Sequence, residues 1–110
     1  MIIRIKYFLL ISIIFLVTSC TKEPLDLNKT LVEKDGLYYI KDTEKLYSGP
    51  IFTNYDNDAI KEEGIYKKGK KDGKFVFWYD NGNMEKSGVY KENKLHGRWI
   101  YWNDDGQKFM

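Results

Sequence analysis

The stretch that decides the fold is GKFVFWYDNGNMEKSGVYKENKLH, residues 73–96, because its pattern occurs nearly three times in the chain. The preceding unit, residues 49–72, is GPIFTNYDNDAIKEEGIYKKGKKD, and a shorter unit, residues 97–110, is GRWIYWNDDGQKFM. Each unit begins with glycine, and tyrosine, aspartate and a second glycine also recur at the 24-residue interval. A fixed interval of this kind is typical of a repeat fold, in which each unit is one supersecondary element.

Each unit carries the local signals of a β-hairpin. An apolar or alternating run ends in an acidic turn, which is DND at residues 56–58, DNG at 80–82 and DDG at 104–106. A second run follows and closes at Gly69 in one unit and at Asn93 in the next. Asn and Gly most readily adopt the positive φ that tight hairpin turns demand. The pattern predicts an all-β fold over residues 35–110, an elongated antiparallel meander of repeated hairpins that forms a single twisted sheet.

Residues upstream of the repeat predict an atypical first unit. Residues 35–40 and 46–48 flank a polar stretch, and we expect them to form an opening hairpin that caps the repeat. Glycines and β-branched or aromatic residues interrupt every candidate helix after Cys20, so no helix is expected there.

The first 19 residues have the layout of an export signal. Arg4 and Lys6 precede an apolar stretch, residues 7–17, that is short for a permanent membrane span. The following VTSC, residues 17–20, resembles the lipobox of bacterial lipoproteins, in which a diacylglycerol is attached to the cysteine and the signal is cleaved before it. The resemblance predicts a cleaved signal peptide over residues 1–19, a lipidated Cys20, and a flexible tether to residue 34. An ordinary signal peptide or a single transmembrane helix is the alternative.

Charge and cysteine content exclude several classes of function. Cys20 is the only cysteine, so no intramolecular disulfide can form. Removal of residues 1–19 leaves 16 basic and 16 acidic residues, and this balance argues against binding to nucleic acid, which requires an excess of Lys and Arg. It also argues against electrostatic adhesion to anionic lipid as the main anchor.

The repeat is similar to the bacterial variant of the MORN repeat, in which a tyrosine, an acidic residue or Asn and a Gly precede a Gly-x-Tyr and a closing glycine. The spacing in YDNGNMEKSGVYKENKLHGRWIYWNDDG, residues 79–106, carries the resemblance, which covers residues 37–107 and is strongest over residues 64–106. It implies stacked antiparallel hairpins and a role as scaffold or contact surface. Some bacterial relatives carry the label of a toxin–antitoxin component. Pro50, Thr53 and Asp58 depart from the pattern and make the first unit the one we expect to be distorted.

Alternation along the strands places aromatic side chains on both faces of the predicted sheet. Residues 51, 75 and 99 and residues 53, 77 and 101 share one face, where ring ladders would cover the glycines of neighbouring strands. The other face carries Trp78 and Trp102, which could stack on a sugar or hold a partner protein. Tyr79, Tyr101 and Trp99 are further candidates for partner binding.

No catalytic set, metal site or cofactor is predicted. His96 is the only histidine, and its position in the repeat indicates a polar turn residue. Ser48 and Ser87 are the only serines after Cys20, so no nucleophilic triad can be assembled. The acidic turns lack the ligand number of a dedicated calcium site.

These observations predict an exported, non-enzymatic binding or scaffold module that lipid on Cys20 anchors to a bacterial membrane. The outer membrane is expected in a cell that has two membranes. The expected partner is an envelope protein or a glycan, and the oligomeric state stays open. The alternative is an immunity or antitoxin-like protein that neutralises one toxin, and a glycan-binding or glycan-hydrolysing envelope protein is the third hypothesis.

Overall fold

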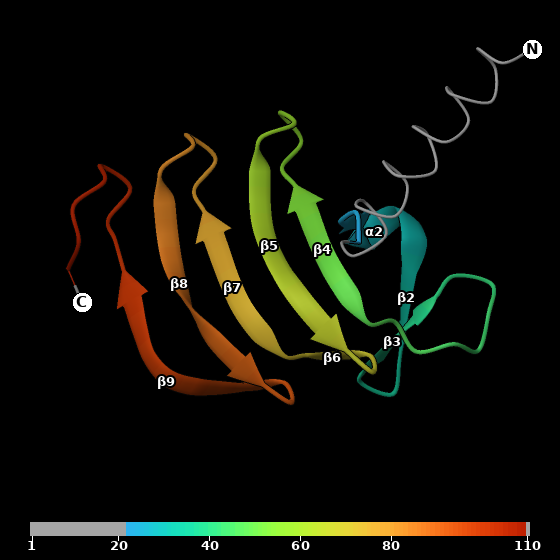
Figure 1. Cartoon of the computed structure of the whole chain (residues 1–110). Helices are drawn as coiled ribbons and strands as arrows, with labels where there is room; N and C mark the ends of the chain where they lie inside the picture. The colour runs from blue at the N-terminus through green and yellow to red at the C-terminus, as the bar shows by residue number, and fades with distance from the viewer. Residues whose placement is uncertain (1–21, 110) are drawn as a thin grey trace, which may run out of the picture.

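The computed structural model of the chain describes residues 22–109, so Cys20 and the predicted signal peptide lie outside the described residues. A seven-stranded sheet dominates the fold (Figure 1). Its main path runs β1-β4-β5-β7-β8-β9, and the short β6 pairs with β5. The strands are β1 (Leu25–Asp26), β4 (Gly49–Asn54), β5 (Ile60–Lys67), β6 (Lys70–Lys71), β7 (Gly73–Trp78), β8 (Met84–Lys91) and β9 (Lys94–Tyr101). The predicted all-β meander of hairpins is confirmed.

Two kinds of turn alternate along the meander. We call residues 55–59, 79–83 and 103–107 the aspartate turns; in the second of them, Tyr79 N donates to Asn83 O at 2.7 Å and Gly82 N donates to Tyr79 O at 3.1 Å. The same pair of bonds closes the other two aspartate turns. We call residues 67–71 and 91–94 the lysine turns, and their central residues all have positive φ, with Gly69 at 79° and Asn93 at 69°. Two successive positive φ values define the tight hairpin turn that matches strand twist, which confirms the predicted geometry.

The first unit is not distorted. Its strands pair in the same register as those of the second unit, with the same irregularity before the aspartate turn: Asn54 pairs with Ile60 as Trp78 pairs with Met84. Asp58 adopts a φ of 68° at the position where Gly82 has 91°. Aspartate tolerates the left-handed conformation better than most residues, so the missing glycine does not change the turn.

One face of the sheet, which we call the inner face, alternates rings with glycines. Ile51 pairs with Gly64 and Phe75 with Gly88, while Tyr66 pairs with Gly49 and Tyr90 with Gly73. The ring of Phe75 lies so close over Gly64 that a Cβ there would fall well inside the 3.0 Å that real Cβ atoms keep, and Trp99 lies over Gly88 in the same way. Glycine therefore gives each ring room to lie flat on the sheet. The predicted ring ladder over the glycines is confirmed.

The rings of the inner face contact one another in sequence across the strands. Tyr38, Tyr66, Phe75, Tyr90 and Trp99 form an edge-to-face series with centroid distances of 5.2, 6.0, 5.0 and 5.0 Å. Such pairs contribute about 0.5–1.5 kcal/mol each beyond the area that they bury. The ladder thus provides a core for a sheet that has no second layer across most of its width.

The segment before the repeat is folded, and two predictions fail there. Leu25–Asp26 pairs in parallel with β4, and it is followed by a short helix, α2 (Leu27–Thr30), with Leu27 and Leu31 buried. The predicted flexible tether is therefore wrong from Leu25 onward, and so is the expectation of no helix. The helix depends on its context, because the Asp26 side chain caps it by accepting a bond from Asn28 N at 3.1 Å and Leu27 packs into the core.

The predicted opening hairpin forms in part, and its first strand, β3, has a further partner. β3 (Leu37–Ile40) pairs with β2 (Leu31–Lys34) in a separate two-stranded sheet, across a turn at Asp35 and Gly36. The segment that we expected to pair with β3 forms one antiparallel bridge, Tyr39 with Leu46, which backbone bonds from Ile40 N to Lys45 O at 2.9 Å and from Tyr47 N to Tyr38 O at 3.0 Å support. The fold is therefore one main sheet with a small sheet at its β4 end, and the parallel β1 makes the main sheet mixed.

Candidate functional site

The five aromatic residues predicted to bind a partner do not form one surface. Trp99 is buried on the inner face, where its Nε1 donates to Val89 O at 3.1 Å. Tyr101 is half-buried on the same face and packs against the core, with its ring centroid 6.2 Å from that of Phe109. The structure thus places Trp99 and Tyr101 in the core.

Tyr79 joins one repeat unit to the next. Its hydroxyl donates to the carbonyl oxygen of Trp102 at 2.7 Å, and one unit earlier the Tyr55 hydroxyl donates to the carbonyl oxygen of Trp78 at the same distance. The third unit has Asn103 at this position. Sequence reasoning did not predict this contact between units, although the 24-residue spacing of the two tyrosines was a signal for it.

The aspartate turns are also joined to one another. Asn57 Nδ2 donates to Asp80 O at 3.3 Å, and Asn81 Nδ2 donates to Asp104 O at 2.9 Å. The oxygen of each of these amides accepts a backbone N–H of its own turn, from Ala59 and Asn83 respectively. Asparagine therefore shapes its own turn and also holds the next one.

Trp78 and Trp102 lie on the opposite face of the sheet, which we call the outer face. Trp78 follows the inner-face residue Phe77 and pairs with Met84, and its side chain is half-buried, as is that of Trp102. Only the main-chain carbonyls of the two tryptophans take part in the tyrosine contacts. The apolar side chains of the outer face are Phe52, Ile60, Ile65, Val76, Trp78, Met84, Val89, Ile100 and Trp102.

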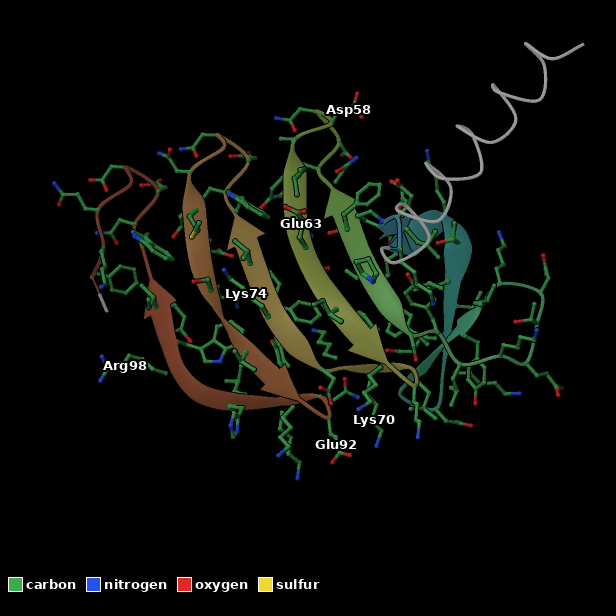
Figure 2. The ribbon with its side chains drawn as sticks, in the orientation of Figure 1. Asp58, Glu63, Lys70, Lys74, Glu92 and Arg98 are labelled. Carbon is green, nitrogen blue, oxygen red and sulfur yellow. The ribbon has the colours of Figure 1, made fainter. Side chains whose placement is uncertain are left out.

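The outer face is largely open to solvent. Ile60, Ile65 and Val89 are 43%, 44% and 40% exposed, which is high for aliphatic side chains in a sheet. A hollow of about 280 Å³ lies over Pro50, Ile65 and Val76, with Pro24 at its rim. Glu63 and Lys74 are the charged residues between the apolar ones on β5 and β7 (Figure 2). Contiguous apolar surface of this kind marks an interaction site in soluble domains.

The charges of the sheet are separated along the strands. The aspartate turns contain five aspartates and no Lys or Arg, whereas the lysine turns contain six lysines and Glu92. Figure 2 shows Asp58 at one end of the strands and Lys70 with Glu92 at the other. The balance of basic and acidic residues after Cys20 thus conceals one acidic and one basic end.

The tyrosines of the inner face have altered acidity. Burial raises the pKa of Tyr66 well above its ordinary value, with smaller contributions from the neighbouring Tyr38 and Glu62. Burial also raises the pKa of Tyr90 and of Tyr38. These hydroxyls therefore stay protonated at neutral pH.

The described residues offer little for catalysis. His96 is exposed, and the Ser48 hydroxyl accepts a bond from Lys68 N at 2.8 Å. Within residues 22–109 no group of three His, Cys, Asp or Glu side chains is placed to hold a metal ion. No helix in this part of the chain is long and apolar enough to cross a membrane.

Comparison of the chain with protein-family models, with curated proteins and with solved structures found no match. The similarity to MORN repeats and to the lipobox therefore stays a prediction from the sequence.

Proposed function

We propose that the protein is a non-enzymatic binding or scaffold module of the cell envelope, held at a membrane by lipid on Cys20. The observation that carries the binding role is the outer face, on which exposed apolar side chains lie among a few charged ones. Of the described residues before the repeat, Glu23 and Pro24 line hollows on this face. The membrane attachment rests on the sequence around Cys20 alone.

The energetics favour a partner on this face. Burial of apolar surface is worth about 25 cal/mol per Å². A partner that covers the exposed aliphatic side chains would therefore gain a large part of the binding free energy of a stable interface. Trp78 and Trp102 have the side-chain type that most often dominates interface energies.

A binding role also agrees with the placement of the other aromatic side chains. Trp99, Tyr101 and the Tyr79 hydroxyl are used within the fold, so Trp78 and Trp102 are the predicted binding residues whose side chains remain for a partner. An envelope protein is the partner that we favour, because the exposed side chains of the outer face include the aliphatic Ile60, Ile65 and Val89. A glycan would need more polar groups around the two tryptophans.

Site-specific photo-crosslinking in intact cells tests the proposal. A photoreactive amino acid at Val76 or Val89, both on the outer face, should give the same crosslinked partner. A probe at Lys45, in the loop after β3, is the matched control and should not trap it. The double variant Trp78→Ala, Trp102→Ala should lose the crosslink while it keeps the melting temperature within a few degrees. Unchanged crosslinking in this variant contradicts the assignment of the face.

Lipid attachment needs its own experiment, because Cys20 lies outside the described residues. Cells fed a clickable fatty acid should label the wild-type chain, and Cys20→Ala should remove the label. Label that persists in Cys20→Ala refutes the anchor and has no bearing on the binding face.

A further inference from the structure

β9 is the last strand of the main sheet, and one of its two edges has almost no strand partner among the described residues. β8 pairs with one side of β9, and on the other side a single bridge joins Trp102 to Lys108, next to a bond from Phe109 N to Tyr101 O at 3.0 Å. Among residues 22–109 no other strand reaches that side of β9. The edge from Lys94 to Ile100 therefore presents free backbone donors and acceptors.

The repeat shows which strand geometry suits this edge. β4 pairs with β5, and β7 pairs with β8, each across an aspartate turn. The bridge of Trp102 to Lys108 is the counterpart, 24 residues on, of the pair between Trp78 and Met84. Among residues 22–109, pairing on this side of β9 stops at that bridge. An antiparallel strand in the phase of β8 would continue the sheet from this bridge.

The charge along the edge selects the partner. Lys94, His96 and Arg98 are all exposed, and Figure 2 shows Arg98 projecting away from the sheet. Pairing of β9 with β9 of a second copy would set basic side chains against basic ones, which is unfavourable in a strand pair.

We propose that the free edge of β9 binds an extended acidic segment of a partner protein by antiparallel strand addition. Main-chain hydrogen bonds supply affinity in this mode, and the side chains along the strand supply specificity. We expect the segment to pair with β9 in the register in which β8 pairs with β7. A small residue of the segment then lies opposite Trp99, as Gly88 lies opposite Phe75. Its acidic side chains face Arg98 and His96, at the positions that correspond to Val89 and Lys91 of β8. This site is distinct from the outer-face tryptophans.

Two peptides derived from the β8 sequence test the charge requirement. The acidic peptide is MEKSGEYE, which is residues 84–91 with Glu in place of Val89 and Lys91, and the basic peptide is MEKSGKYK. Each carries a dye, and its binding to the detergent-solubilised full-length chain is measured by fluorescence anisotropy. At low salt the acidic peptide should bind at least about tenfold more tightly, because charge complementarity at a strand pair and its rim sets partner choice. Equal affinities, or no binding of the acidic peptide, overturn the proposal.

Charge reversal in the protein provides the matched control. Arg98→Glu should reverse the preference toward the basic peptide. Lys74→Glu changes the corresponding residue one unit earlier, which lies inside the sheet on β7, and should leave the preference unchanged. A reversal by Lys74→Glu, or none by Arg98→Glu, refutes binding at the β9 edge.

Backbone methylation separates strand addition from simple charge attraction. In an antiparallel pair only every second residue directs its N–H toward the neighbouring strand. Of two acidic peptides N-methylated at alternate phases, one should therefore lose binding and the other should retain it. Equal binding of both refutes strand addition. The double variant Trp78→Ala, Trp102→Ala should bind the acidic peptide normally, so failure of the outer-face proposal and failure of this one are distinguishable.

Discussion

Replacing Gly64 by alanine tests whether ring-over-glycine packing holds the sheet together. Gly64 has an ordinary strand conformation, so alanine in an open strand position would be stabilising by about 0.5–1 kcal/mol. Here the new Cβ would overlap the Phe75 ring, whose side chain has no exposed surface. Overpacking of a filled site costs about 1–3 kcal/mol. We therefore expect net destabilisation of about 1–2 kcal/mol, opposite in sign to the strand preference.

A double-mutant cycle isolates the contact. Phe75→Leu removes Cζ and Cε2, two of the three ring atoms nearest to the new Cβ. The pair Gly64→Ala, Phe75→Leu should lose less stability than the sum of the single variants, by about 1 kcal/mol, as expected for residues in direct contact. Urea unfolding followed by tryptophan fluorescence measures each free energy of unfolding.

Gly82→Ala is the control for the cycle. Gly82 lies in an aspartate turn with a φ of 91°, and no atom lies within 4 Å of its virtual Cβ. Its alanine variant should lose about 1–2 kcal/mol through backbone strain and should be additive with Phe75→Leu. An additive result for Gly64, or a Gly64→Ala protein as stable as the wild type, would refute the packing argument.

Three further predictions concern the tyrosines and the first turn. Tyr79→Phe removes the bond to the Trp102 carbonyl and should lower the free energy of unfolding by about 1 kcal/mol in the same urea assay; no loss would contradict the contact between units. The raised pKa of Tyr66 means that the unfolded chain loses this proton first, so stability should fall as pH rises above about 10, and less steeply in Tyr66→Phe. Equal slopes in urea unfolding at pH 8–11 would refute that assignment. Asp58→Gly should raise the melting temperature by a few degrees, since glycine relieves the positive φ at no steric cost; a lower melting temperature would show that the Asp58 side chain itself stabilises the turn.

The repeat made most of the sheet predictable, because its signals are local. The acidic turns, the positive-φ positions at Gly69 and Asn93, and the period-two alternation are each readable within a few residues, and the structure has all of them. The structure of residues 25–34 was not predicted, because it depends on contacts with residues that are distant in the sequence. Leu25, Leu27 and Leu31 are too few to establish a strand or helix period, and their burial depends on β4 and Tyr47, which lie some 20 residues away.

The candidate site was predictable only in part. Alternation correctly separated Trp78 and Trp102 from the ring ladder, since the side-chain period of a strand is fixed. It could not show that the Tyr79 hydroxyl bonds to the next unit, because that contact depends on how the turns stack in space. Total charge likewise could not reveal the separation of Asp from Lys, which depends on which turns lie at the same end of the strands.

The 24-residue alignment, considered with the structure, separates residues that build the sheet from residues that are free to vary. The inner-face glycines and the tyrosines that join units repeat in identity, and each has a structural contact or backbone conformation that accounts for it. The aspartates at positions 56, 80 and 104 also repeat. Outer-face positions change from unit to unit: Asn54 becomes Trp78 and Trp102, and Pro50 becomes Lys74 and Arg98. A repeat scaffold needs only its shared positions in order to fold. Specificity for a partner should therefore be sought where the units differ, on the outer face and along β9.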